Sequence, residues 1–141
     1  MKVMIGIPAF NEEKNIGLLV AKLTQKYDVV IVCDDGSTDM TSTIVSSMGA
    51  HLIRHEKNQG YGSAISTLFD YCRKENADIM LTIDGDGQFL PEEIPKLVSD
   101  IQQKKSDIVI GYRFDDATDM PNYRRFGNKM LDKMANMVTE I

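Results

Sequence analysis

Short apolar runs alternate along the chain with segments in which apolar residues recur every third or fourth position. The runs are continuous, as in buried parallel strands, and they occupy residues 3–7, 29–32, 51–54, 79–83 and 108–110. The helical spacing predicts amphipathic helices near residues 16–23, 40–48, 65–72 and 94–101. Repeated strand–helix units predict an α/β fold, with a mostly parallel sheet covered by helices on both faces.

Polar residues and a proline mark the starts of the predicted helices. Asn11 is predicted to cap the first helix, with Glu12 and Glu13 in its first turn. Ser37–Asp39 resembles a capped helix start, and Pro91 suits the first turn of a later helix. The helix near 65–72 is predicted to bury an apolar face that comprises Ile65, Leu68, Phe69 and Cys72.

The end of the chain follows a different pattern, a loop over 115–122 and then a helix with an apolar stripe. The stripe comprises Phe126, Met130, Met134 and Met137. Basic residues lie beside it: Arg124, Arg125, Lys129 and Lys133. Such a stripe needs a partner surface, and packing on the chain's own sheet is the favoured interpretation. A homodimer contact and a membrane-surface contact are the alternatives. We therefore expect one domain, 1–141, with a core over 1–112 and a tail over 113–141.

Composition narrows the class of protein. The chain has 141 residues, 43% hydrophobic and 26% charged, as expected of one globular domain. A net charge of -5 argues against a general nucleic-acid binder, although a divalent cation would still let nucleotide phosphates bind. Cys33 and Cys72 lie in apolar stretches, which predicts buried thiols and no disulfide. With no signal peptide and no apolar run of transmembrane length, we expect a cytoplasmic protein.

The strongest candidate site follows the predicted strand 79–83. Asp84, Asp86 and Gln88 occupy alternate positions between glycines, and alternate side chains of an extended segment point the same way. Three oxygen ligands at the carboxyl end of a parallel strand suit Mg²⁺ or Mn²⁺, bound together with water and phosphate oxygens. The alternative is an acidic, glycine-rich turn without a ligand.

Two further predicted strands end in polar turns, Pro8–Glu13 and Asp34–Asp39, which would lie at the same sheet edge. Asp35 could accept a hydrogen bond from a nucleobase N–H, but taken alone it is better explained as a turn residue. Gly60–Tyr61–Gly62 offers either backbone N–H donors for a ligand or an ordinary helix entry. Both histidines are interpreted as structural or solvated. A dinucleotide motif after the first strand and a P-loop are both absent from the sequence.

Four motifs, taken together, resemble the inverting family 2 glycosyltransferases of the Rossmann-like GT-A fold. They are Pro8–Glu13, Asp34–Asp39, Asn58–Gly60 and Asp84–Gln88, and they occur in the order and spacing of that family. Within the family the chain looks most like the polyprenyl-phosphate sugar transferases, of the dolichyl-phosphate mannose synthase type, from Met1 to about Lys129. Each motif alone is a weak signal, and all four in order are a strong one.

The resemblance implies roles for particular residues. The segment Pro8, Ala9, Phe10, Asn11 and Glu12, together with Asp35, would contact the base and ribose of a GDP- or UDP-linked sugar. Asp84–Gly85–Asp86 matches the family's DXD motif, which holds the metal at the donor diphosphate, and Gln88 falls where close relatives place a third ligand. Arg113 and Arg124 correspond to phosphate-binding arginines, although Tyr112 departs from the family's Gly-Ser-Arg. Asp86 is the candidate catalytic base, a role with which metal ligation would compete.

Members of this family continue into a further half that builds the acceptor site, and many carry membrane-associated C-terminal elements. The chain therefore resembles the donor-binding half of an enzyme that transfers a sugar, with inversion, to an acceptor such as polyprenyl phosphate. Membrane association is expected only of a full-length form. Two alternatives remain: a nucleotidyltransferase, which can also place a metal-binding acidic pair on an α/β sheet, and a non-catalytic nucleotide-sugar-binding or assembly module.

Overall fold

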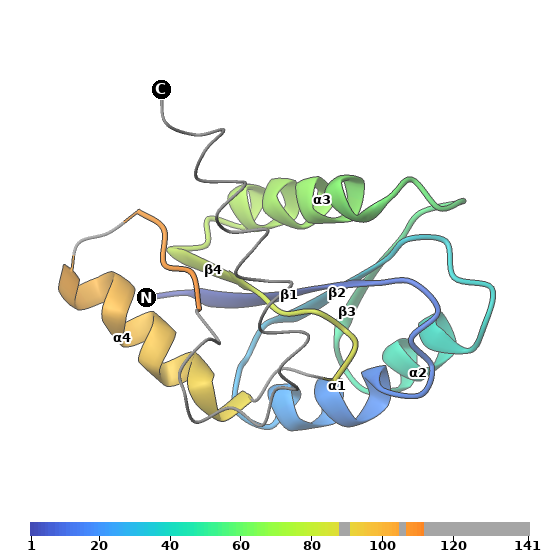
Figure 1. The fold of residues 1–141 in the computed structure, drawn as a ribbon, viewed down its shortest axis with the longest axis horizontal. Coiled ribbons are helices and arrows are strands. Elements are labelled where there is room, and N and C mark those ends of the chain that lie inside the picture. The colour runs from blue at the N-terminus through green and yellow to red at the C-terminus, as the bar shows by residue number, and fades with distance from the viewer. Residues whose placement is uncertain (88–90, 105–106, 112–141) are drawn as a thin grey trace, which may run out of the picture. The chain divides into compact units, whose positions relative to one another are not determined.

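The computed structural model describes residues 1–87, 91–104 and 107–111, and the chain divides into two compact units, Met1–Asp107 and Ile108–Ile141. Strands and helices alternate along the first unit (Figure 1). Its strands are β1 (Val3–Ala9), β2 (Val30–Asp34), β3 (His51–Arg54) and β4 (Ile79–Thr82). Its helices are α1 (Ile16–Thr24), α2 (Thr41–Ser47), α3 (Tyr61–Lys74), the 3-10 helix η1 (Pro91–Glu93) and α4 (Ile94–Lys104).

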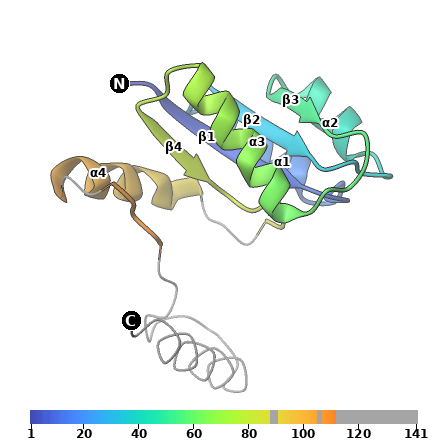
Figure 2. The same ribbon diagram turned by 90° about the horizontal axis from the view of Figure 1, so that it is seen from above.

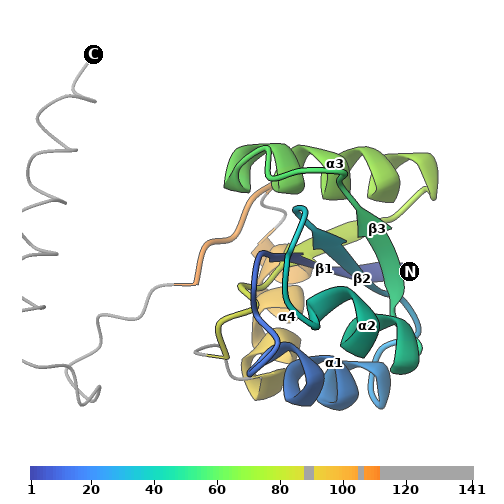
Figure 3. The same cartoon turned by 90° about the vertical axis from the view of Figure 1, so that its right-hand side faces the viewer.

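The strands form a parallel sheet in the order β3-β2-β1-β4. Helix α3 covers one face of the sheet, and α1, α2 and α4 lie on the other face (Figures 1 and 3). Seen from above, α3 crosses over β1 and β2 (Figure 2). The predicted parallel sheet with helices on both faces is confirmed.

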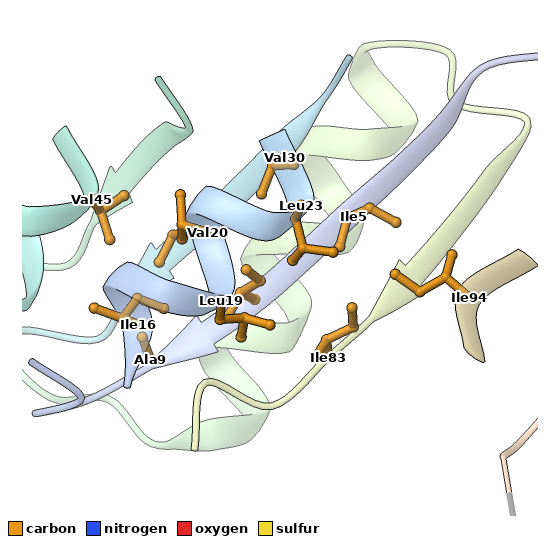
Figure 4. Packing of buried hydrophobic residues seen from close by; sticks show 12 residues of the cluster. Ile5, Ala9, Ile16, Leu19, Val20, Leu23, Val30, Val45, Ile83 and Ile94 are labelled. Atoms are coloured by element: carbon orange, nitrogen blue, oxygen red, sulfur yellow. The ribbon is translucent and has the colours of Figure 1, made fainter. Parts of the chain in front are cut away.

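Residues of β1 and β2 alternate between two apolar cores, because successive side chains of a strand point to opposite faces. The core beneath α1 includes Ile5 and Val30, packed with Leu19, Val20 and Leu23 (Figure 4). The core beneath α3 comprises Met4, Ile31, Cys33, Ala64, Leu68 and Cys72. Both cysteines are buried free thiols, as predicted. Burial on both faces holds the central strands, and hence the loops that follow them, in fixed positions.

The predicted fifth strand is wrong. Ile108 and Ile110 have no regular structure and are 77% and 84% exposed. Among the described residues no strand pairs with this segment, which belongs to the second unit. A strand is stable only when neighbours satisfy its backbone groups, so an apolar run alone was an insufficient signal here.

Two smaller predictions also need correction. Phe69 is 56% exposed, because the buried stripe of α3 runs at four-residue intervals through Ala64, Leu68 and Cys72, and Phe69 is rotated out of it. Asn11 does not cap α1, which begins at Ile16. The helix predicted for the stripe of 126–137, and the homodimer contact considered as an alternative for it, fall outside the described residues.

Candidate functional site

Each strand of the parallel sheet is followed by a loop at the same edge, on the right of Figure 1. We name these loops L1 (residues 10–15), L2 (35–40), L3 (55–60) and L4 (83–87). Open α/β sheets bind ligands at this edge, beyond the carboxyl ends of their strands. The predicted site residues that the structure describes lie in these loops or, for Pro8 and Ala9, at the buried end of β1.

Loops L1 and L2 are joined by hydrogen bonds between backbone and side chains. The Asn11 N–H donates to Ser37 Oγ (2.9 Å), and the Thr38 N–H donates to Asn11 Oδ1 (2.9 Å). The Glu12 N–H donates to Thr41 Oγ1 (2.9 Å). Asn11 has a φ of 56°, in the left-handed region that Asn tolerates better than most residues. Asn11 is therefore a loop-closing residue, which explains why it is not a helix cap.

Asp34 and Asp39 shape L2 from within. Asp34 is fully buried and accepts hydrogen bonds from the Ser37 N–H (2.9 Å) and from Ser42 Oγ. Asp39 Oδ1 accepts from the N–H of Thr41 (3.0 Å), the first residue of α2. The helix start predicted at Ser37–Asp39 comes too early, because α2 begins at Thr41 after Met40 and has no side-chain cap hydrogen bond. The carboxylate of Asp34 is used by the fold.

The carboxylate of Asp35, the predicted base-reading residue, accepts hydrogen bonds from L3. It is 3% exposed, and its Oδ1 accepts from His55 Nδ1 (2.6 Å) and the Gln59 N–H (2.9 Å). Its Oδ2 accepts from the Gly60 N–H (2.8 Å). Burial raises the pKa of this carboxyl group, but the hydrogen bonds from Gln59, His55 and Gly60 outweigh it and hold the pKa below its ordinary value. Asp35 therefore orders L3.

Gly36 allows L2 and L3 to touch. A Cβ at this position would lie 2.5 Å from the carbonyl carbon of Lys57 and 2.7 Å from the nitrogen of Asn58, well inside van der Waals contact. Its φ of 74° is also one that side chains with a Cβ rarely adopt. Only glycine fits both requirements, so the contact between the two loops depends on this residue.

Loop L4 carries Asp84 and Asp86, and both are exposed. Asp84 Oδ1 accepts a hydrogen bond from the Tyr61 hydroxyl (3.0 Å), which links L4 to the first turn of α3. Burial and, after it, the contact with Asp84 raise the pKa of Tyr61. The extended conformation expected here ends at Thr82, and Gly85 and Asp86 lie in a turn. The alternating geometry of a strand therefore does not position the carboxylate of Asp86.

Loop L4 also passes close to L1. A Cβ at Gly85 would lie 3.4 Å from the carbonyl oxygen of Pro8 and 3.5 Å from Glu12 Cγ. At Gly87 the corresponding contact is Asn15 Cβ, at 3.5 Å. The predicted metal-binding turn and the predicted base-binding segment are thus brought together, as the sequence motifs required.

The two carboxylates of L4 fit one particular kind of metal site. Mg²⁺ usually keeps several waters and is held by one or two carboxylates together with substrate phosphates, and Asp84 and Asp86 can supply that pair. Among the residues that the structure describes, no group of three or more His, Cys, Asp or Glu side chains could hold a metal ion. Gln88, Arg113 and Arg124 lie outside the described residues, so their roles stay predictions.

Sequence reasoning missed the side chains that contact Asp35 and Asp84. His55 contacts Asp35, and Thr67 of α3 contacts His55 Nε2 (2.9 Å). Tyr61 lies between Gly60 and Gly62, the two residues that make this segment conspicuous in the sequence. A signal did exist, because His55 directly follows β3 and Tyr61 opens α3, and both positions belong to the ligand-binding edge. By contrast His51 stacks on Tyr71 (ring centroids 4.6 Å apart) and is exposed, as a structural or solvated histidine should be.

A parallel sheet with helices on both faces and polar loops gathered at the carboxyl ends of its strands defines an α/β protein of the Rossmann-like type. The family is then shown by comparison: the chain belongs to glycosyl transferase family 2, whose model matches residues 4–139. The membership confirms the predicted family.

Relatives in this family include named polyprenyl-phosphate sugar transferases. The UDP-N-acetylglucosamine–dolichyl-phosphate N-acetylglucosaminyltransferase of Methanococcus voltae is 33% identical, over 89% of this chain and 59% of its own. The dolichol-phosphate mannosyltransferase of Pyrococcus furiosus is 33% identical, over 100% of this chain and 41% of its own. The chain spans about half the length of the curated relatives that it matches.

Solved structures show the same fold. Glucosyl-3-phosphoglycerate synthase from Mycobacterium tuberculosis, in complex with Mn²⁺ and UDP-glucose, matches with a TM-score of 0.61 and 26% identity. The match covers 72% of this chain and 39% of that one. The sheet is therefore that of a GT-A glycosyltransferase. None of the helices described here is long and apolar enough to cross a membrane.

Proposed function

We propose that this chain binds the nucleoside diphosphate of a sugar donor, and that the whole enzyme transfers the sugar to a polyprenyl phosphate. The observation that carries the proposal is the approach of L4, with its two exposed carboxylates, to the Pro8–Glu12 segment at the ligand-binding edge. Relatives named as dolichyl- and undecaprenyl-phosphate sugar transferases support the acceptor class.

The donor is proposed to be UDP-linked, with a GDP-linked sugar as the alternative. One relative is named for UDP-N-acetylglucosamine, and the structurally similar synthase was crystallised with UDP-glucose. In this proposal Pro8 to Glu12 contact the base and ribose, and Asp35 accepts a hydrogen bond from the base. Arg113 and Arg124 contact the phosphates.

Asp84, Asp86 and Gln88 are the residues proposed to hold Mg²⁺ or Mn²⁺. When bound, the ion would neutralise the charge that develops on the leaving diphosphate. A phosphate acceptor is already ionised at neutral pH, so its attack on the anomeric carbon needs little help from a base. Asp86 is therefore assigned first to the metal, and only second to the role of catalytic base. Transfer would take place at a membrane surface, where polyprenyl lipids reside.

Calorimetric titration of the chain with UDP-glucose, UDP-N-acetylglucosamine and GDP-mannose, each with and without Mn²⁺, tests the proposal. We expect a UDP-linked donor to bind only in the presence of Mn²⁺, with a dissociation constant between about 1 μM and 1 mM, the usual range for enzyme substrates. Absence of binding to every donor with Mn²⁺ present would contradict it. Release of pyrophosphate from UTP and a sugar phosphate would instead identify a nucleotidyltransferase.

A further inference from the structure

A row of hydrogen-bonded polar side chains connects Asp35 with Thr67 of α3 through His55, the first residue of L3. His55 Nδ1 is 2.6 Å from Asp35 Oδ1, and His55 Nε2 is 2.9 Å from Thr67 Oγ1. The side chain of His55 is 10% exposed and that of Asp35 is 4% exposed. Cys33 Sγ lies 3.6 Å from His55 Nε2. None of His55, Thr67 and Cys33 has a role in the donor site described above.

The hydrogen positions in this row follow from the chemistry of its members. An ionised carboxylate only accepts hydrogen bonds, so the hydrogen in the short contact with Asp35 is on His55 Nδ1. The other ring nitrogen, Nε2, forms its hydrogen bond with the Thr67 hydroxyl. Burial and, after it, the charges of Asp35 and Asp34 raise the pKa of Cys33 to about 11, so the thiol is protonated at neutral pH.

The row limits what Asp35 can offer to a ligand. A carboxylate has about four acceptor positions, two on each oxygen. His55 and the Gln59 N–H use both positions of Oδ1, and the Gly60 N–H uses one of Oδ2. One acceptor position remains, on Oδ2. A single acceptor suits a single N–H donor, such as the imide of uracil, better than guanine, which presents an N–H and an amino group side by side.

We propose that His55 is a positioning residue for the donor base, acting through Asp35. Its Nδ1–H occupies Oδ1 and fixes the rotation of the carboxylate, Thr67 fixes the ring, and Oδ2 is left as the one acceptor for a pyrimidine imide. This inference rests on the proposed function, because it assumes that the base meets Asp35. It adds a reason for preferring uracil to guanine that lies outside the residues expected to touch the ligand.

Two substitutions of His55 separate the contact with Asp35 from the presence of a polar side chain. The amide nitrogen of Asn takes the place of His Nδ1, and that of Gln takes the place of Nε2. His55→Asn therefore keeps the donor to Asp35, whereas His55→Gln loses it. His51→Gln, at an exposed histidine, is the matched control. Calorimetric titrations with UDP, GDP and inorganic pyrophosphate, all with Mn²⁺, distinguish base contacts from diphosphate contacts.

In His55→Gln we expect the affinity for UDP to fall about tenfold and the preference for UDP over GDP to narrow, with the affinity for pyrophosphate unchanged. His55→Asn and His51→Gln should bind UDP like the wild type. Wild-type UDP affinity in His55→Gln would overturn the inference. So would an equal loss of UDP and pyrophosphate affinity, which would show a purely structural role.

If His55→Gln does not fold, Thr67→Val tests the inference instead. This variant keeps the His55 ring and removes the hydroxyl that orients the ring. A UDP affinity lowered by about threefold with pyrophosphate binding intact supports the inference, and an unchanged UDP affinity overturns it. Failure of the proposed function is distinguishable from failure of this inference, since wild-type protein would then bind neither UDP nor pyrophosphate with Mn²⁺.

Discussion

At the scale of single residues, the aspartates at the strand ends differ in burial, and burial separates their roles. Asp34 and Asp35 are buried, and protein donors occupy their oxygens. Asp84 and Asp86 are exposed in L4. Buried carboxylates with several donors order a fold, whereas exposed ones at a strand end are accessible to a cation. Asp34 thus serves the scaffold. Asp35 orders L3 and, by our proposal, keeps one acceptor position for the base, and the exposed pair in L4 is proposed to hold the metal.

Asp35 is expected to make the protein less stable at acid pH. Its folded-state pKa lies below the unfolded value, ordinarily about 3.9, so its contribution is complete above that value. The contribution is lost as the pH falls through the folded-state pKa. We expect the free energy of unfolding to fall more steeply below about pH 4 in the wild type than in Asp35→Asn. Denaturant unfolding at a series of pH values measures both slopes, and equal slopes would contradict the assignment.

The same variant tests the base contact proposed for Asp35. At pH 7 Asp35→Asn should be less stable by about 1–3 kcal/mol, because an amide cannot accept all the donors that surround it. Its affinity for UDP should also fall, while the dependence of binding on Mn²⁺ is kept. Lower stability with unchanged UDP affinity would assign Asp35 to the fold alone.

At the scale of elements, the contact between L2 and L3 depends on Gly36. Gly36→Ala should lower the free energy of unfolding by more than about 2 kcal/mol, since it adds both a backbone clash and a strained φ. Gly62→Ala is the matched control: it lies in the first turn of α3 with no atom within 4 Å of its Cβ position. Alanine there should leave stability unchanged or raise it by up to about 1 kcal/mol. Equal effects of the two substitutions in thermal unfolding would disprove the role of Gly36.

The elements that sequence predicted well are those whose signal is local. The strand His51–Arg54 has its predicted bounds, and the helix stripe through Ile16, Leu19, Val20 and Leu23 is buried as predicted. The exposure of Ile108 and Ile110 was not predictable from their own residues, because strand formation depends on a partner elsewhere in the chain. Asn11 was misassigned for a similar reason, since its partner Thr38 is distant in sequence.

The candidate site also has one feature that the sequence predicts and one that depends on partners distant in the chain. Its position was predictable, because motifs that follow parallel strands must share one edge of the sheet. The hydrogen bonds of His55 were not predictable, because Asp35, His55 and Thr67 belong to separate segments that meet only in the folded protein. Side chains that support a site from behind leave little pattern in a single sequence.

At the scale of the whole molecule, loops from different parts of the chain meet at one edge of the sheet. Hydrogen bonds join L1 to L2 and L2 to L3, and Tyr61 joins the start of α3 to L4. The chain spans about half the length of the curated relatives that it matches. The part present here contains all the loops that we propose for the base and the metal, so donor binding is the activity to measure in it.

The most direct test of this account is a calorimetric titration of UDP, with and without Mn²⁺, into wild type, Asp86→Ala and the control Asp28→Ala. Asp28 is an exposed carboxylate that precedes β2, away from the loops of the site. Wild type and Asp28→Ala should bind UDP in an Mn²⁺-dependent way. Asp86→Ala should lose the Mn²⁺-dependent binding while the fold stays intact. Unchanged Mn²⁺-dependent affinity in Asp86→Ala would contradict the assignment of L4 as the metal-binding turn of a donor site.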